Sequence, residues 1–157
     1  MQKLTKLIIS IIIPFIAAAI GSFFTSPAVM TWYATLQKPG FAPPNWIFAP
    51  VWTILYLLMG ISLYLVWREG WDKKEVKKGM IVFFIQLALN AAWSIIFFGL
   101  QLPFYAFVEI IFLWFSIYLT MLLFSNVSRK AAYLFVPYLL WVSFALVLNY
   151  FIFIINF

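Results

Sequence analysis

Cysteine and histidine are both absent from the 157 residues, and acidic residues number four. Without these side chains there is no disulfide, no thiol nucleophile, no histidine base and no Cys/His metal site. Four carboxylates also leave little for calcium binding, so we expect no metal. What is abundant is apolar, because 67% of residues are hydrophobic, 22% aromatic and 9% charged. This composition excludes a water-soluble globular protein and indicates an all-α integral membrane protein.

Five stretches with at most one charge are long enough to cross a bilayer as helices, which takes about 20 residues. We expect helices over about 7–24, 46–67, 80–100, 104–124 and 131–155. The first stretch also has features of a secretory signal, but its apolar run is long enough to span. The predicted fold is a five-transmembrane-helix bundle that forms a single membrane domain over residues 1–157.

Positive charge is distributed unevenly between the predicted loops. Nine of the ten Lys and Arg lie on the side of the N-terminus and of loops 68–79 and 125–130, whereas Lys38 lies on the other. This bias predicts a cytoplasmic N-terminus and a C-terminus outside. With the lack of a charged C-terminal tail, it favours a prokaryotic plasma membrane. The lysine-rich run at 73–78 is compatible with an anionic lipid or nucleic-acid patch, but we favour the topological role and expect no nucleic acid.

The connection at residues 25–45 is long and rich in aromatic residues and proline, whereas the other connections are short. Prolines fix φ and remove N–H donors, so we expect a stiff loop that is not helical. A long, rigid loop of this kind indicates a lid over a cavity. A loop that rests on the membrane interface is the alternative.

Three predicted helices carry a face that combines aromatic with polar side chains at helical spacing. The members of these faces are Trp52 and Tyr56; Gln86, Asn90 and Trp93; and Tyr138, Trp141 and Asn149. Amides facing lipid would be costly, so they should point inward, either to bond between helices or to line a cavity. We expect the aromatic side chains to converge on a site for a flat, apolar ligand with a few polar edges.

Glu109 is the single formal charge inside a predicted span. An intramembrane carboxylate is a functional candidate, as a proton relay or an ion site. It lies only about 8–9 Å beyond Pro103, at ~1.5 Å per residue. This shallow depth favours a structural or interfacial role.

Several separated motifs carry a family resemblance. They are WYATLQKPGFAPP at 32–44, PVWTILYLLMG at 50–60, QLALNAAWS at 86–94, and PYLLWVSFA with LNY between 137 and 150. With these motifs the chain resembles the TspO/MBR family of tryptophan-rich sensory and translocator proteins, from about Pro14 to Tyr150. The resemblance implies five transmembrane helices, a homodimer, and a pocket under the loop 25–45. In the family this pocket binds porphyrins such as protoporphyrin IX, and isoquinoline or benzodiazepine drugs.

The resemblance and the helical faces together assign a set of ligand-binding residues, with the two prolines shaping the lid. They are Tyr33, Pro43, Pro44, Trp52, Tyr56, Asn90, Trp93, Tyr138, Trp141 and Ala145. Light-dependent porphyrin breakdown is attributed to some members, and Trp52 and Trp141 would be the catalytic positions for it. No cofactor is obligatory; protoporphyrin IX is the expected ligand.

Two features of the sequence limit the ligands. No basic residue follows Tyr150, so the C-terminal sterol pattern of some members is incomplete and sterol binding there is not expected. Without His or Cys the usual ligands of haem iron are missing, so we expect a metal-free porphyrin whose propionates point toward Lys38. The predicted function is a receptor or sensor, with tetrapyrrole transport as an extension. The alternatives are a light-dependent porphyrin-degrading enzyme and a transporter with Glu109 as proton relay.

Overall fold

The computed structural model describes residues 2–157, which form helices and connections and no β-strand. The elements are α1 (Lys3–Met30), α2 (Trp32–Thr35), the 3-10 turn η1 (Asn45–Ile47), α3 (Phe48–Trp67), α4 (Lys74–Ser94), the π-helical turn η2 (Ile95–Gly99), α5 (Pro103–Ser125), α6 (Arg129–Leu134) and α7 (Val136–Asn156). Five helical segments within this range are long and apolar enough to cross a membrane. The five-helix bundle predicted from the sequence is therefore confirmed.

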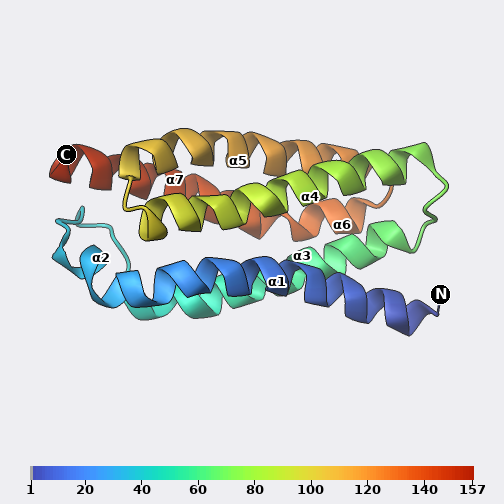
Figure 1. Ribbon diagram of the computed structural model, residues 1–157. Coiled ribbons are helices and arrows are strands. Elements are labelled where there is room, and N and C mark those ends of the chain that lie inside the picture. Colours follow the sequence, from blue (N-terminus) through green and yellow to red (C-terminus); the bar gives the residue numbers. More distant parts are fainter. Residues whose placement is uncertain (1) are drawn as a thin grey trace.

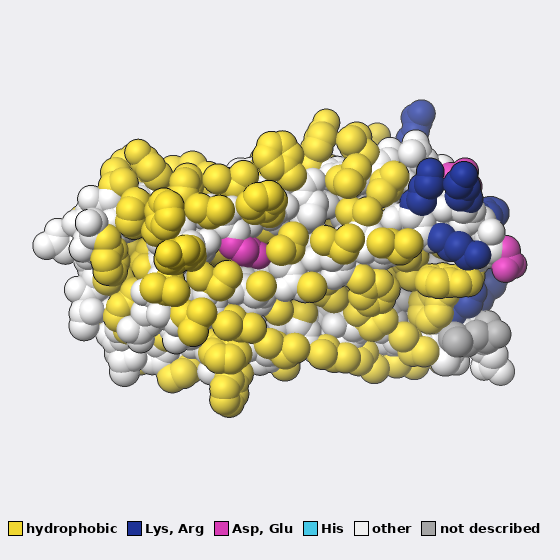
Figure 2. Space-filling model, turned by 45° about the horizontal axis from the view of Figure 1, so that its top comes forward, with side chains coloured by type: hydrophobic (Ala, Val, Ile, Leu, Met, Phe, Trp, Pro, Cys, Tyr) yellow, Lys and Arg dark blue, Asp and Glu magenta, His cyan; other side chains and the backbone are white. Residues whose placement is uncertain are grey.

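The long helices run side by side, and their connections gather at two opposite ends (Figure 1). One end holds the N-terminus, the α3–α4 connection and the α5–α6 connection. The other end holds the C-terminus, the loop after α2 and the α4–α5 turn. Lys and Arg side chains cluster at one end of a largely hydrophobic surface in Figure 2. The loops thus sort onto two ends as the sequence predicts, while the membrane orientation stays a prediction.

Close packing of α1 against α3 depends on Gly60. A Cβ atom at this position would lie 2.7 Å from the Cα of Ile11 and 2.9 Å from the carbonyl oxygen of Ser10. Small residues allow such an approach, and in lipid this packing is a main source of helix association. The contact fixes α1 to α3 at the level of Ile11 and Gly60.

The first helix is longer than predicted. It continues to Met30 through Thr25, Ser26 and Pro27, whereas the sequence indicated an end near residue 24. These residues look like a loop because proline and hydroxyl side chains favour turns. They stay helical because this last part of α1 forms one wall of an internal pocket, which Thr25 and Ser26 line.

The prediction of a non-helical loop over 25–45 was consequently wrong at both edges. Trp32–Thr35 forms a helical turn, and Asn45–Ile47 forms a 3-10 turn. The non-helical segment is residues 36–44, which holds the prolines that lack an N–H donor.

Two other predicted boundaries also differ from the structure. The helix expected from residue 80 begins at Lys74, because a charged first turn can extend beyond the apolar part of the bilayer. The last predicted helix is interrupted at Phe135, so that α6 and α7 are separate. Pro137 explains the break, since it lacks an N–H and is tolerated in the first turn of the new helix.

Candidate functional site

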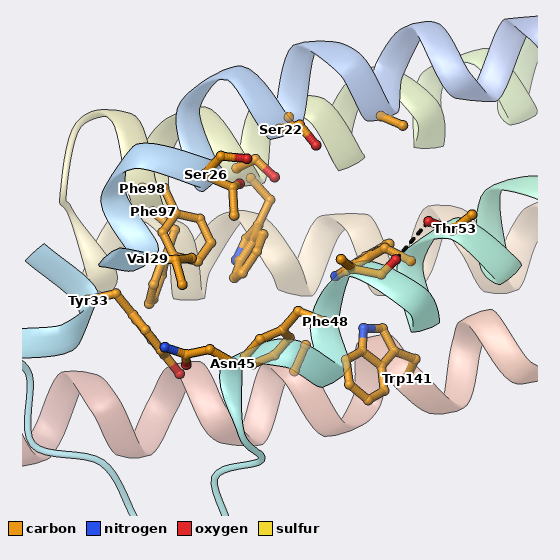
Figure 3. Close-up of a pocket in the computed structure, with 18 of the residues that line it drawn as sticks. Ser22, Ser26, Val29, Tyr33, Asn45, Phe48, Thr53, Phe97, Phe98 and Trp141 are labelled. Carbon is orange, nitrogen blue, oxygen red and sulfur yellow. Dashed lines mark hydrogen bonds between the residues drawn. The ribbon is translucent and has the colours of Figure 1, made fainter. Parts of the chain in front are cut away.

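A pocket of about 820 Å³ lies inside the bundle, between α1, α3, α7 and the α4–η2 segment. Figure 3 shows aromatic side chains from these elements around one central space, toward the end of the molecule that holds α2. Sites for drug-sized ligands and cofactors typically occupy roughly 300–1,000 Å³. The pocket is therefore of a size that a cofactor-like molecule fills.

Six of the ten predicted ligand-binding residues line this pocket. They are Tyr33, Trp52, Tyr56, Trp93, Trp141 and Ala145. They come from four different helices, and the structure brings them together as the aromatic faces predict. Trp52 stacks on Tyr56 with ring centroids 5.6 Å apart, and Trp93 stacks on Phe97 at 5.1 Å. These stacks hold the ring faces of the wall in fixed positions.

Asn90 and Tyr138 do not line the pocket but lie behind its wall, where they are 3% and 0% exposed. The hydroxyl of Tyr56 donates to Oδ1 of Asn90 at 2.5 Å, and Nδ2 of Asn90 donates to the hydroxyl of Tyr138 at 2.7 Å. Tyr138 in turn donates to Oε1 of Gln86 at 2.9 Å. This chain of hydrogen bonds satisfies buried polar groups and orients Tyr56, whose ring does line the pocket.

Pro43 and Pro44 are likewise outside the set of lining residues. The segment 36–44 lies instead against the end of α7. Asn156 accepts from the backbone N–H of Gln37 and donates to its carbonyl, both at 2.8 Å. Phe41 packs edge-on against Phe144 and Phe151. The prolines thus shape a segment that is fastened to α7, and they do not touch the space below.

Two polar atoms at the pocket have no partner among residues 2–157. They are the hydroxyl of Tyr33 and Nε1 of Trp141, both shielded from solvent. Burial raises the pKa of Tyr33 to about 12, so it is a neutral donor at physiological pH. A shielded donor without an acceptor is costly. A ligand with hydrogen-bond acceptors on its edge would remove this free-energy cost at the Tyr33 hydroxyl and at Nε1 of Trp141.

Trp93 and Asn149 form a second polar connection at the wall. Nε1 of Trp93 donates to Oδ1 of Asn149 at 3.0 Å, and Nδ2 of Asn149 donates to the carbonyl of Pro103 at 2.9 Å. Gln86, Asn90 and Asn149 are all buried, so the prediction that these amides face inward is confirmed. Asn149 thus forms hydrogen bonds from α7 to α4 and α5, and it also lines the pocket.

Phe97 continues the predicted face of Asn90 and Trp93 at helical spacing, but the π-helical turn η2 adds Phe98, which was not predicted. Its wider turn places both Phe97 and Phe98 at the pocket. Gly99 allows this, because a Cβ there would lie 2.7 Å from Cδ1 of Phe24. Turns of this kind often occur at functional sites.

The sequence reading also missed the contribution of α1. Ser22, Thr25, Ser26 and Val29 line the pocket. Their spacing of three and four residues in an otherwise apolar helix was the available signal. It was hidden because the helix was expected to end near residue 24.

Glu109 is not among the lining residues. Both of its carboxylate oxygens are shielded and have no hydrogen-bond partner within the described part of the chain. Its predicted structural or interfacial role and the proton-relay alternative both stay predictions.

With this geometry in place, comparison with known proteins identifies the family. The model of the TspO/MBR family matches residues 10–155. The chain belongs to the TspO/MBR family. The match covers nearly all of the five spans and every residue that lines the pocket, so the resemblance carried by the sequence motifs is confirmed.

Similar proteins occur in bacteria, archaea and mammals. The chain is 51% identical over 136 residues to the tryptophan-rich protein TspO of Chlorobaculum tepidum, covering 87% of this chain and 86% of the relative. It is 47% identical over 156 residues to the tryptophan-rich protein TspO of Archaeoglobus fulgidus, covering 99% of each. It is 40% identical over 139 residues to the translocator protein of Homo sapiens, covering 87% and 82%. Family and fold together make it an integral membrane protein, and the TspO/MBR family supports a receptor or sensor role in that membrane.

Proposed function

We propose that the chain is a membrane receptor or sensor that binds porphyrins, with protoporphyrin IX as the reference ligand, in the intrahelical pocket. The observation that carries the proposal is the convergence of Tyr33, Trp52, Trp93 and Trp141 around a space of about 820 Å³. Flat aromatic surfaces suit a flat, conjugated ligand. The same walls would accept isoquinoline or benzodiazepine-type molecules, and tetrapyrrole transport would be an extension of such binding.

The polar groups at the pocket fit this ligand class. Tyr33 and Trp141 each offer a donor without a protein partner. Lys38 lies over the Tyr33 ring, with Nζ 4.6 Å from the ring centroid, and donates to the carbonyl of Leu36 at 3.2 Å. A porphyrin with its propionates toward this end would place negative charge near Lys38. We propose a metal-free porphyrin, because the chain has no His or Cys to ligate haem iron.

A competition experiment tests the proposal. Purified protein is loaded with protoporphyrin IX in the dark and titrated with an uncharged isoquinoline ligand; a shared pocket predicts complete displacement. Lys38→Glu should weaken porphyrin binding by about tenfold, roughly 1.4 kcal/mol, because it puts a negative charge near the propionates. It should leave the isoquinoline affinity within about twofold. Independent binding of the two ligands would overturn the shared pocket, and unchanged porphyrin binding in the variant would overturn the placement of the propionates.

A second candidate is light-dependent oxidative degradation of the bound porphyrin, with Trp52 and Trp141 as redox partners and dioxygen as the oxidant. The favouring observation is that Trp52 stacks on Tyr56, which is hydrogen-bonded through Asn90 to Tyr138. Loss of porphyrin absorbance under light in wild type, but not in Trp52→Phe or Trp141→Phe, would support the enzyme. Intact porphyrin after illumination would contradict the enzyme, and the receptor would remain as the proposed function.

We also propose a homodimer as the working form, as the family resemblance implies. The mass of the protein in detergent, after subtraction of the detergent, tests it. A value of twice the 18.3 kDa chain supports the dimer, and a single chain mass contradicts it.

A further inference from the structure

The pocket is not closed on the side where α1 and α3 face each other. Among its lining residues, exposed positions on these two helices include Ala19, Ser22 and Ser26 on α1, and Ala49 and Thr53 on α3. We call this set the α1–α3 window. In Figure 3, Ser22 and Ser26 project from α1 toward the gap, and Thr53 lies across it on α3.

The window follows from how the two helices are fixed. Gly60 brings α3 against Ile11 of α1, so the helices are in contact at that level. Thr53 and Ala49 lie two and three turns from Gly60 on the same face of α3. The same distances from Ile11 along α1 lead to Ala18 and Ser22, which have small side chains and also line the pocket. The seam between α1 and α3, which is in backbone contact at Gly60, thus carries small side chains beside the pocket, and several of them are exposed.

The surroundings of the window are those of a surface in contact with lipid. Ile16 and Ile20 on the outer face of α1 are 55% and 44% exposed, and Ile54 on α3 is 57% exposed. Trp46 and Met30, which border the pocket at its outer end, are 73% and 78% exposed. The hydroxyl of Thr53 donates to the carbonyl of Ala49 at 2.7 Å, so this donor is satisfied within α3 and needs no water molecule. Large exposed apolar side chains on a membrane helix are positioned for acyl chains.

A second possible route into the pocket passes segment 36–44, and contacts with α7 fasten this segment. Two hydrogen bonds join Asn156 to the backbone of Gln37, and Phe41 packs between the rings of Phe144 and Phe151. None of residues 36–44 lines the pocket. This segment lies over the end of α7, and passing it would require breaking these contacts.

We propose that the pocket exchanges its ligand with the bilayer, through the α1–α3 window. The ligand class is a flat, hydrophobic molecule that dissolves in the membrane, and an acyl chain of a phospholipid occupies the window when the ligand is absent. This inference rests on the proposed function for the identity of the ligand. The window itself, and its contact with lipid, do not depend on it.

A kinetic experiment tests the route. Protein in vesicles is mixed with vesicles that carry protoporphyrin IX, and binding and release are followed by porphyrin fluorescence. Ser26→Phe narrows the window and should slow both entry and release by about tenfold. Ile20→Phe places the same side chain on the lipid-facing side of α1 and should change neither rate. Asn156→Ala releases segment 36–44 from α7 and should also change neither.

Whether the release rate rises or falls distinguishes an obstructed window from a loss of contacts with the ligand. A variant that has only lost contacts with the ligand releases it faster, whereas an obstructed window releases it more slowly. Faster release in Ser26→Phe would therefore overturn the proposal. Faster entry in Asn156→Ala would do the same, because it would place the route past the loop.

A second measurement does not need a porphyrin. Because the chain has no cysteine, Ser22→Cys carries a single fluorophore at the window and Ile20→Cys one on the lipid-facing surface. Phospholipids with brominated acyl chains should quench both. Quenching at Ile20→Cys without quenching at Ser22→Cys would overturn the window. If both are quenched and no porphyrin binds, the window stands and the proposed ligand is wrong.

Discussion

At the scale of single residues, the pocket depends on polar groups that are satisfied behind its wall and left unsatisfied at its surface. Asn90 links Tyr56 to Tyr138, and both its amide atoms are used. Tyr33 and Trp141 instead keep a donor free at the pocket. The first arrangement holds the aromatic wall in place. The second leaves directional contacts for a ligand.

Replacing Asn90 tests the supporting role. Asn90→Ala removes the acceptor of Tyr56 and the donor to Tyr138, so at least one hydroxyl is left buried and unpaired. We expect a loss of about 1–3 kcal/mol in the free energy of unfolding, seen as a lower unfolding temperature in detergent. Tyr105→Phe, at an exposed hydroxyl on α5, is the control and should be neutral. Equal stability of Asn90→Ala and wild type would show that the hydrogen bonds are not needed.

Glu109 is the opposite case, since neither carboxylate oxygen has a hydrogen-bond partner among residues 2–157. Replacing a shielded, unpaired polar group by an apolar one of similar size should stabilise the protein. We expect Glu109→Leu to raise the free energy of unfolding by about 1–3 kcal/mol, measured by thermal unfolding in the same detergent. Destabilisation would mean that the carboxylate has an essential partner. Loss of porphyrin flux across vesicles in Glu109→Gln would favour the proton-relay alternative.

At the scale of helices, the bundle is set by a few close approaches. Gly60 lets α3 contact the backbone of α1 near Ile11, and both helices line the pocket farther along. The position of the pocket is thus linked to the position of this contact.

Adding one methyl group at Gly60 tests that link. The Cβ of Gly60→Ala would lie 2.7 Å from backbone of α1, which cannot yield without moving the helix. We expect a loss of about 1–3 kcal/mol in the free energy of unfolding. Gly40→Ala is the matched control, because nothing lies within 4 Å of a Cβ at Gly40. A variant at Gly60 that unfolds like the control would show that α1 and α3 do not meet as described.

The comparison between sequence and structure is clearest at this scale. Apolar length predicted the five spans, and helical spacing predicted the aromatic and polar faces that hold Trp52, Trp93 and Trp141, because both are local properties. The end of α1 was not predictable in the same way. Thr25, Ser26 and Pro27 have the composition of a loop, but they belong to α1, and Thr25 and Ser26 line a pocket that forms only in the folded bundle.

Pro43 and Pro44 show the same limit. The sequence predicted that these prolines make the segment rigid. It did not predict which part of the bundle the segment contacts. Segment 36–44 is bonded to Asn156, which lies 119 residues from Gln37. A contact of that separation depends on the packing of the whole bundle.

At the scale of the whole molecule, nine of the ten basic residues lie with the N-terminus and the loops at 68–79 and 125–130. The bias predicts that this end is cytoplasmic and that the pocket, near the other end, lies toward the outside. The receptor would then meet its ligand in the outer half of the membrane.

Single cysteines introduced into this cysteine-free chain test the orientation. Gly40→Cys should react with a membrane-impermeant maleimide on intact bacterial cells. Lys130→Cys, which is exposed at the opposite end, should react only after the membrane is disrupted. The reverse pattern would show that the N-terminus lies outside.

The central claim is that the aromatic pocket binds a porphyrin, and a titration in the dark tests it most directly. Protoporphyrin IX is added to the purified protein while tryptophan fluorescence is recorded, in wild type, Trp141→Phe and Trp71→Phe. Trp141 borders the pocket with a free donor, whereas Trp71 lies in the α3–α4 connection at the far end. We expect saturable quenching in wild type and Trp71→Phe, and binding weaker by about tenfold, or roughly 1.4 kcal/mol, in Trp141→Phe. Quenching that does not saturate, or equal binding in all three proteins, would contradict the account.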